Sequence, residues 1–263
     1  METTGYLASI LIGISLGLIG GGGSILTVPV LVYLFAVDTV LATTYSLFVV
    51  GSTSLAGSFP YFKKGLIDVK TAVFFGIPSI IAVFLTRHYL LPHVPEHIMN
   101  VDSFALTKSI LLMLFFAVLM VFASYSMIKK GSEDQPASQR PAKAIGVIVQ
   151  GTMVGIVTGL IGAGGGFLII PALVNLLKLP MKTAIGTSLI IIAVNSLTGF
   201  GFSLGQIHIQ WPFLITVTLI AIVGIFIGSY LSTKIDGKKL KPAFGWFVLV
   251  MGIYILLKET LLK

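Results

Sequence analysis

Apolar residues follow one another along this chain in ten blocks, which short polar or glycine-containing stretches separate. Several stretches carry no Asp, Glu, Lys or Arg over 20 to 51 consecutive residues. About 20 apolar residues suffice for a helix that spans a bilayer, so the pattern predicts an all-α polytopic membrane protein. The blocks lie at residues 6–19, 25–37, 41–61, 71–86, 104–128, 144–161, 167–177, 183–203, 211–233 and 242–261.

The second half of the chain repeats the first. Residues 17–57 and 159–199 align without a gap and agree at 17 of 41 positions. Each half has a glycine-interrupted segment followed by three longer apolar blocks. The polar stretch between the halves contains two prolines, as a loop does. We therefore expect a first membrane repeat at 1–128, a linker at 129–143 and a second membrane repeat at 144–263, as in transporters built from two related halves.

The glycine-interrupted segments can cross the membrane once or form short hairpins. One straight helix of 34 residues would be about 51 Å long, which exceeds a bilayer core of about 30 Å. If both segments form re-entrant or short hairpins, 13 of the 17 basic residues share one side; if each crosses once, the division is 9 to 8. Positive charge gathers on the cytoplasmic side, which favours hairpins. This predicts two inverted repeats, each a glycine-broken short-helix hairpin plus three transmembrane helices, with both termini outside.

The two glycine runs are the expected substrate site. Consecutive glycines hold a helix poorly, and the backbone groups that they expose must face protein or a water-filled cavity. An opened helix N-terminus there offers N–H groups and partial positive charge to an anion. The alternative is that these glycines only allow close helix crossing. The predicted ligands are Gly20, Gly21, Gly22, Gly23, Ser24, Gly162, Gly164, Gly165 and Gly166.

The block after each glycine run supplies polar side chains that could complete the site. Ser46 and Thr53 are seven residues apart, as are Ser188 and Asn195, so each pair shares one helix face. We add these four residues and Thr187 to the predicted substrate-binding set. The alternative is that such hydroxyls bond the carbonyl one turn earlier or join helices. Asn195 is the strongest candidate, because a buried amide needs partners.

Composition and charge narrow the chemistry. The chain is 56% hydrophobic and 10% charged, it has no cysteine, and its net charge is +8. The distribution of that charge indicates membrane topology rather than a nucleic-acid partner. No nucleophile–base pair, phosphate-binding loop or zinc-protease motif is present, so we expect no enzyme, no cofactor and no metal. His88, His93, His97 and Glu96 have a spacing that could bind a metal, but we interpret them as a solvated outer loop.

The expected spans hold no Asp, Glu, Lys or Arg near their middle. A proton relay or cation site built on a buried carboxylate is therefore not expected. Backbone N–H groups and neutral side chains suit a small desolvated anion instead.

At these motifs the chain resembles the sulfite exporter (TauE/SafE) family of membrane permeases. "GLIGAGGGFLIIPALVNLLKLPMKTAIGTSL", residues 159–189, is similar to that family's second-half signature, and "GLIGGGGSILTVPVLVYLF", residues 17–35, to its first-half counterpart. The resemblance covers essentially the whole chain and implies a plasma (inner) membrane carrier for sulfite, organosulfonates or related small sulfur-containing anions, often moved outward. Thr44 and Tyr45 stand where the second-half pattern has Gly and Thr, so the two half-sites are expected to be unequal.

These observations predict a secondary transporter that exports small sulfur-containing anions by alternating access, with the anion bound at the glycine breaks. A passive anion channel and a membrane assembly or maturation factor without transport are the alternatives. Substrate identity, direction, proton or sodium coupling and oligomeric state stay open.

Overall fold

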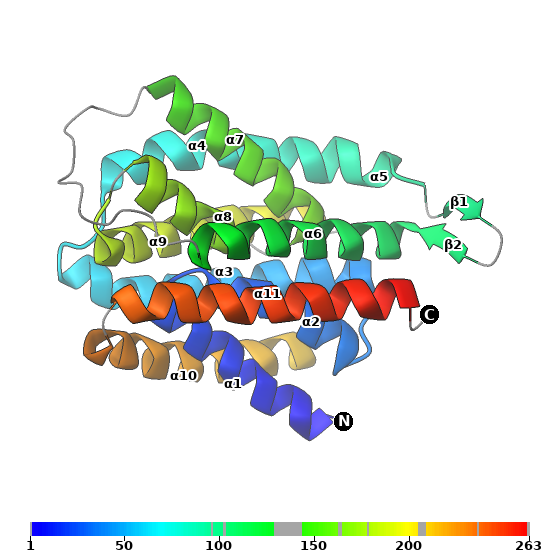
Figure 1. The fold of residues 1–263 in the computed structure, drawn as a ribbon, viewed down its shortest axis with the longest axis horizontal. Coiled ribbons are helices and arrows are strands. Elements are labelled where there is room, and N and C mark those ends of the chain that lie inside the picture. Colours follow the sequence, from blue (N-terminus) through cyan, green and yellow to red (C-terminus); the bar gives the residue numbers. More distant parts are fainter. Residues whose placement is uncertain are drawn as a thin grey trace.

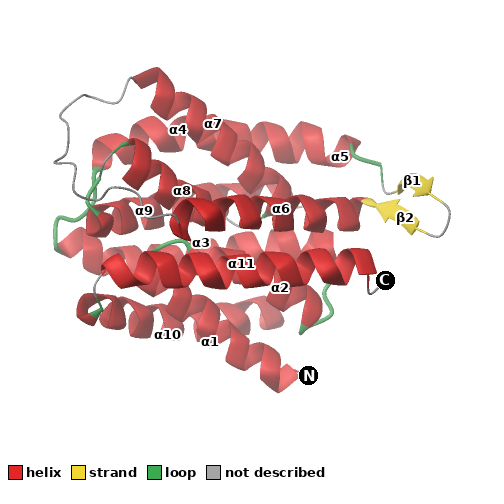
Figure 2. Ribbon diagram, in the orientation of Figure 1, coloured by secondary structure: helices red, strands yellow, loops and turns green. Residues whose placement is uncertain are grey.

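The structure is a computed structural model of the 263-residue chain. It describes residues 2–95, 97–101, 104–128, 144–162, 165–177, 179–204, 209–235 and 237–261. These residues are predominantly helical, which confirms the predicted helical fold class (Figures 1 and 2). One antiparallel hairpin, of strands β1 (His97–Val101) and β2 (Phe104–Thr107), is an addition in the region that we expected as an outer loop. The helix expected from residue 104 therefore begins only at Lys108.

Each half forms two short helices around its glycine run and then three longer helical segments. The first half consists of α1 (Glu2–Ile19), α2 (Gly22–Tyr33), α3 (Thr39–Lys63), α4 (Val69–Leu85), α5 (Leu91–His93) and α6 (Lys108–Ile128). The second half consists of α7 (Ala144–Ile161), α8 (Gly166–Pro171), α9 (Met181–Ser203), α10 (Trp211–Lys234) and α11 (Gly237–Leu261). One π-helical turn, Thr86–Leu90, joins α4 to α5, and another, Ala172–Leu176, extends α8. The predicted linker, residues 129–143, lies outside the described residues.

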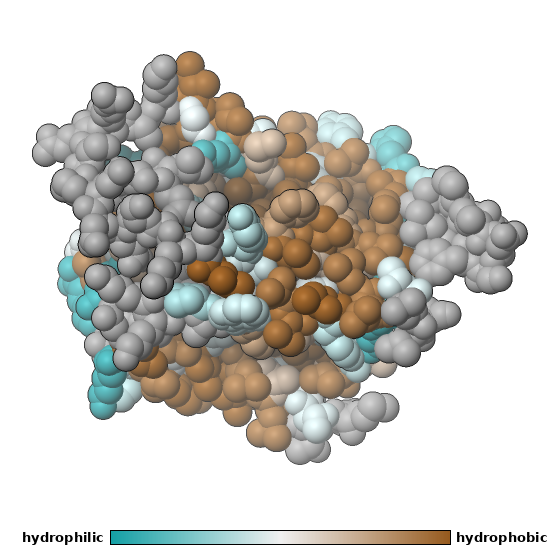
Figure 3. Space-filling model, viewed as in Figure 1, coloured by the Kyte–Doolittle hydropathy of each residue, from teal (hydrophilic) through white to brown (hydrophobic). Residues whose placement is uncertain are grey.

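Five helical segments among the described residues are long and apolar enough to cross a membrane. They are Thr39–Lys63, Val69–His93, Lys108–Tyr125, Met181–Ser203 and Trp211–Ser232. The helices beside the glycine runs, α1, α2 and α7, are apolar but shorter. Large apolar side chains also cover much of the exterior, and they dominate the middle of the face drawn in Figure 3. An apolar exterior on apolar helices of this length is what a multi-pass membrane protein requires.

The helices of the two halves pack against each other in pairs that recur when the halves are exchanged. Helix α1 lies along α10, and α7, its counterpart in the repeat, lies along α4. Helix α3 packs on its own counterpart α9, and α6 packs on α11, side by side in Figure 1. Both termini lie at the right-hand end of Figure 1, whereas α7 begins at the left-hand end.

Small residues bring two of these pairs into close contact. A Cβ atom at Gly13 would lie 2.7 Å from the nitrogen of Ile225, and one at Gly155 would lie 2.7 Å from the Cβ of Ala82. Gly13 and Gly155 occupy equivalent positions of the two repeats, so the same repeat position makes the α1–α10 and the α7–α4 contact. Small residues at four-residue spacing allow such approach between membrane helices. Close helix crossing is therefore the role of these glycines, which lie outside the two glycine runs.

The central pair, α3 and α9, is antiparallel. The start of α3 lies near the end of α9, because Leu47 approaches Gly199. The other end is fixed by Gly57, which lies close to Leu189, and by Gly186, which lies close to Tyr61. Several helix ends and a loop meet at this second end. They carry the exposed lysines Lys63, Lys64, Lys70, Lys182 and Lys234.

Candidate functional site

Both glycine runs break the helix at a residue with a left-handed backbone. Gly20 has φ of 76° and Gly162, its repeat equivalent, has φ of 71°. Left-handed φ strains any residue that carries a Cβ atom, so these two positions explain why glycine stands at the start of each run. The breaks end α1 at Ile19 and α7 at Ile161. These two glycines shape backbone turns, and each also lies close to a central helix, Gly20 to α9 and Gly162 to α3.

The first break opens the N-terminus of α2. Its N-cap residue, Gly21, has no side chain to cap the first turn, so the N–H groups there depend on other partners. The Ser24 hydroxyl donates a hydrogen bond back to the Gly21 carbonyl at 2.7 Å, and it is fully buried. The aligned peptide dipoles of α2 place partial positive charge at this buried helix end. Such an end can hold an anion.

The two breaks meet. A Cβ atom at Gly166, the first residue of α8, would lie 2.9 Å from the Cα of Gly21 and 3.2 Å from the Oγ of Ser24. It would also lie 2.6 Å from the Cδ1 of Ile192 on α9. The N-cap residue of α8, Gly165, has a left-handed φ of 65°. Residues of both glycine runs therefore share one buried location; Gly164, another predicted ligand, lies outside the described residues.

The predicted polar side chains of α9 reach this region in two different ways. The Ser188 hydroxyl donates to the Ile185 carbonyl at 2.8 Å and lies 3.3 Å from the carbonyl of Gly20. Asn195 follows Ile192 by one helical turn. Its Nδ2 donates to the Ser79 hydroxyl on α4 at 2.6 Å, whereas its Oδ1 is buried without a hydrogen-bond partner in the described part of the chain. Ser188 thus contacts the first break directly, and Asn195 retains an unused acceptor.

Four further hydroxyls on α3 and α9 are fully buried and have no hydrogen-bond partner among the described residues. They belong to Ser46, Thr53, Ser54 and Ser196. Ser and Thr within helices usually bond the carbonyl one turn earlier, as Ser203 does with Gly199. Buried polar groups that lack such a bond are uncommon and call for an explanation. Their accumulation on the two central helices marks this region as the strongest candidate for a polar ligand site.

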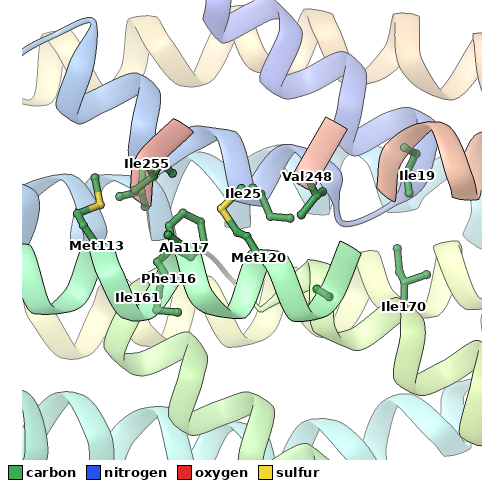
Figure 4. Close-up of a cluster of buried hydrophobic side chains, with 12 residues drawn as sticks. Ile19, Ile25, Met113, Phe116, Ala117, Met120, Ile161, Ile170, Val248 and Ile255 are labelled. Carbon is green, nitrogen blue, oxygen red and sulfur yellow. The ribbon is translucent and has the colours of Figure 1, made fainter. Parts of the chain in front are cut away.

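Apolar side chains cover the other side of both breaks. Helices α6 and α11 contribute Met113, Phe116, Met120, Val248 and Ile255 to one buried cluster (Figure 4). The same cluster contains Ile19 and Ile161, the last helical residues before the two breaks, together with Ile25 and Ile170 beyond them. The polar atoms of α3 and α9 and the apolar cluster of α6 and α11 thus lie on different elements around the breaks.

Thr187 and Tyr45 perform the same structural role in the two halves. The Thr187 hydroxyl accepts a hydrogen bond from the backbone N–H of Asp68 at 2.9 Å. The Tyr45 hydroxyl accepts one from the N–H of Gln210 at 2.7 Å. Thr187 and Tyr45 occupy equivalent positions of the two repeats, as do Gln210 and Asp68. The larger Tyr45 therefore fixes a helix entry, as Thr187 does.

Arg87 is a buried cation that the sequence analysis missed. We expected the apolar block to end at residue 86 with Arg87 outside it, but the π-helical turn carries the segment on to His93. Arg87 is 4% exposed. The local signal that could have indicated burial is the apolar sequence on both sides of this single charge. Glu259, near the end of the predicted block 242–261, is buried as well; it accepts a hydrogen bond from the hydroxyl of Tyr33 at 2.8 Å.

The described histidines do not form a metal site. His88 stacks on Phe84 with the ring centroids 5.3 Å apart, and it is exposed to the exterior with His93. No group of three or more His, Cys, Asp or Glu residues that could hold a metal ion occurs within the described ranges. Glu96, part of the predicted outer-loop group, lies outside those ranges.

Apolar spans, broken helices and a buried polar region between them define a multi-pass helical membrane protein of the transporter class. The family model for the sulfite exporter TauE/SafE matches residues 6–255. The chain therefore belongs to the sulfite exporter TauE/SafE family, as the resemblance of its glycine-run motifs indicated.

Curated relatives are similar over almost the whole chain. A "Probable membrane transporter protein" of Xylella fastidiosa is 28% identical over 254 residues, which cover 94% of this chain and 91% of the relative. The "Probable membrane transporter protein YunE" of Bacillus subtilis is 27% identical over 261 residues, with 91% and 89% covered. A Haemophilus influenzae relative with the same description as the first is 24% identical over 275 residues, with 96% and 97% covered. None of the solved structures matches the chain.

Proposed function

We propose that this protein is a secondary carrier that exports small sulfur-containing anions, such as sulfite or a sulfonate, across the plasma membrane. Membership of a family described as sulfite exporters supports the substrate class. The buried region at the glycine breaks supports an anion, because it offers helix N-termini and hydroxyls rather than carboxylates.

The observation that carries the proposal is the approach of Gly166 to Gly21 and Ser24. In the proposed site the anion lies where these two runs meet and is held by backbone N–H groups of residues 21–24, Gly165 and Gly166. Ser24, Ser46, Thr53, Ser188 and Asn195 border it. An anion there gains hydrogen bonds from the hydroxyls of Ser46 and Thr53, which have no partner among the described residues. Such bonds lose little strength to competing water in a buried region.

The two halves are, in this proposal, inverted repeats. The helix pairing supports this arrangement, since α1 packs along α10 of the other half and its repeat counterpart α7 packs along α4. The antiparallel packing of α3 on its repeat counterpart α9 supports it as well. With Lys63, Lys64, Lys70, Lys182 and Lys234 at one end, the positive-inside rule assigns that end to the cytoplasm. Both termini then lie outside.

Alternating access follows from the same packing. One bundle derived from the repeats rocks against the other around the fixed site, as in other carriers with inverted repeats. The apolar cluster of α6 and α11 stays packed against the breaks. It excludes water from the side of the anion that faces α6 and α11, which is opposite to α3 and α9.

The test is exchange of labelled sulfite in proteoliposomes. Wild-type protein is expected to give saturable efflux that external unlabelled sulfite accelerates. Gly166→Ala is expected to lose most of that efflux, because its Cβ would separate the breaks, whereas Gly201→Ala, whose Cβ meets no atom within 4 Å, is the matched control. Efflux that rises linearly with concentration and shows no acceleration would indicate a channel. A co-purifying protein with no flux would indicate an assembly factor.

A further inference from the structure

The guanidinium group of Arg87 is surrounded by hydroxyls instead of carboxylates. Its Nη1 donates to the hydroxyls of Thr44 and Ser203, each at 3.0 Å, and its Nη2 donates to that of Thr43 at 3.4 Å. Its Nε is buried and has no partner in the described part of the chain. No carboxylate within the described residues pairs with Arg87. Among the described residues, the side chain thus holds a full positive charge whose hydrogen-bond partners are all neutral.

A buried charge of this kind needs a counter-ion. Arg is almost never fully buried without a charged partner, and hydroxyl dipoles compensate only part of the cost of removing a guanidinium from water. An ionisable residue inside a membrane span marks a functional site by default. The π-helical turn that contains Arg87 points the same way, because such turns inside α-helices occur frequently at functional sites. The described residues supply no such counter-ion, and an anionic ligand would meet this requirement.

Arg87 lies beside the second glycine break. Thr43, which accepts from Nη2, packs against Gly162: a Cβ at Gly162 would lie 2.6 Å from the Cβ of Thr43. On the same helical turn, Thr86 packs against Gly159, where a Cβ would lie 2.7 Å from the Thr86 Cβ. One side chain, that of Thr43, therefore separates the guanidinium from the broken backbone.

The equivalent position beside the first break carries no cation. Ser229 on α10 stands there, at the repeat equivalent of Arg87, and its hydroxyl is buried without a partner among the described residues. Ile185 and Gly186 stand at the positions that correspond to Thr43 and Thr44. Both the charge and two of its three hydroxyl neighbours thus belong to one half only. The two approaches to the meeting point of the breaks are electrostatically unequal.

We propose that Arg87 forms a second anion subsite, beside the second break at the end of the molecule where both termini lie. This proposal rests on the proposed carrier function. The ligand is the transported oxyanion, with a sulfite or sulfonate head group whose oxygens accept from Nε and from an Nη of the guanidinium. A planar guanidinium can bind two such oxygens at once. The anion passes between this subsite and the breaks, and Arg87 supplies its counter-charge at this end only.

A purely structural Arg87 predicts a different outcome. As a clamp between α3, α4 and α9, its loss would lower the stability and the amount of folded carrier, and the Michaelis constant for the anion would not change. As an anion subsite, its loss weakens the anion's binding in protein that is still folded. A charge-assisted hydrogen bond to an ion accounts for roughly a tenfold to hundredfold change in affinity.

The main experiment measures sulfite efflux against concentration in proteoliposomes, per amount of inserted folded protein. Arg87→Gln is expected to raise the KM by about tenfold to a hundredfold, and Arg87→Lys, which keeps the charge without the fork, to raise it less. The matched control is Lys63→Gln, an exposed cation at the opposite end, with an unchanged KM. An unchanged KM in folded Arg87→Gln would overturn the subsite and leave the carrier intact. No sulfite or sulfonate flux in wild-type protein would overturn both proposals.

A second measurement does not require an Arg87 variant to fold. Arg87 and Arg140 are the two arginines of the chain, so Arg140→Lys leaves Arg87 as the one target for phenylglyoxal. Methanesulfonate is expected to slow modification of Arg87, read by mass spectrometry, whereas neutral dimethyl sulfone is not. Equal modification rates with and without saturating methanesulfonate, in protein that transports it, would refute the subsite.

Discussion

The close approach of the second break to α3 can be tested with one methyl group. Gly162 and Gly65 both have left-handed backbones, with φ of 71° and 63°. A Cβ at Gly162 would meet the carbonyl and the side chain of Thr43, whereas one at Gly65 would meet no atom within 4 Å. Alanine at Gly65 therefore adds backbone strain alone, and alanine at Gly162 adds the same strain and a steric clash. The difference between the two variants isolates the packing of the break.

The expected magnitudes follow from these two contributions. Left-handed backbone costs a residue with a Cβ atom about 1–2 kcal/mol, so Gly65→Ala is expected to lower the stability of the protein by about that amount. Overpacking a close contact adds typically about 1–3 kcal/mol. Backbone atoms of Thr43 cannot rotate away as a flexible side chain would, which favours the upper part of that range. Gly162→Ala is therefore expected to cost about 2–5 kcal/mol in total.

The assay compares thermal unfolding of the two variants and wild type in one detergent, together with sulfite efflux per folded carrier. Gly162→Ala is expected to unfold at a clearly lower temperature than Gly65→Ala and to lose transport, while Gly65→Ala transports at nearly the wild-type rate. Equal unfolding temperatures of the two variants would refute the close packing of the second break on α3.

Ser188→Ala removes a buried donor beside Gly20 and is expected to reduce sulfite efflux about fivefold, as for the loss of one hydrogen bond of about 1 kcal/mol. Thr216→Ala, which removes an exposed hydroxyl bonded within its own helix, is its control; equal efflux in both would contradict the role of Ser188. Gly155→Leu is expected to prevent α7 from packing on α4 and to abolish monodisperse protein in size-exclusion chromatography, whereas Gly146→Leu, at an open position of the same helix, leaves the elution unchanged. In this chain without native cysteines, an impermeant maleimide is expected to label Lys64→Cys and Lys234→Cys from one side of the membrane and His93→Cys from the other. Labelling of Lys64→Cys and Lys234→Cys from opposite sides would refute the inverted topology.

Local sequence was enough to predict the broken helices. Consecutive glycines and long uncharged runs act within a few residues, and they located the ends of α1 and α7 correctly. The internal repeat also carried tertiary information, since Gly13 and Gly155 make corresponding contacts on α10 and α4.

Contacts between residues distant in the chain could not be predicted from the sequence. Arg87 was expected to lie beyond the end of its apolar block. Hydropathy alone could not predict the π-helical turn that prolongs the span, or the three hydroxyls of α3 and α9 that accept hydrogen bonds from the guanidinium. The sequence also could not show that the Tyr45 hydroxyl makes the same helix-entry bond as the Thr187 hydroxyl. Ser46 and Ser188 occupy equivalent positions of the two repeats. Only the structure shows that the Ser46 hydroxyl has no partner among the described residues, whereas the Ser188 hydroxyl lies beside Gly20.

The central claim is that the anion binds where the two glycine breaks meet, and locating the anion directly tests it best. Selenite matches sulfite in shape and charge, and its selenium scatters X-rays anomalously, so crystals of the transporting protein grown with selenite would reveal its position. The account predicts a selenium peak within hydrogen-bond distance of the backbone at Gly21 and Gly166, bordered by Ser24. Peaks confined to the surface lysines, with none at the breaks, would contradict it.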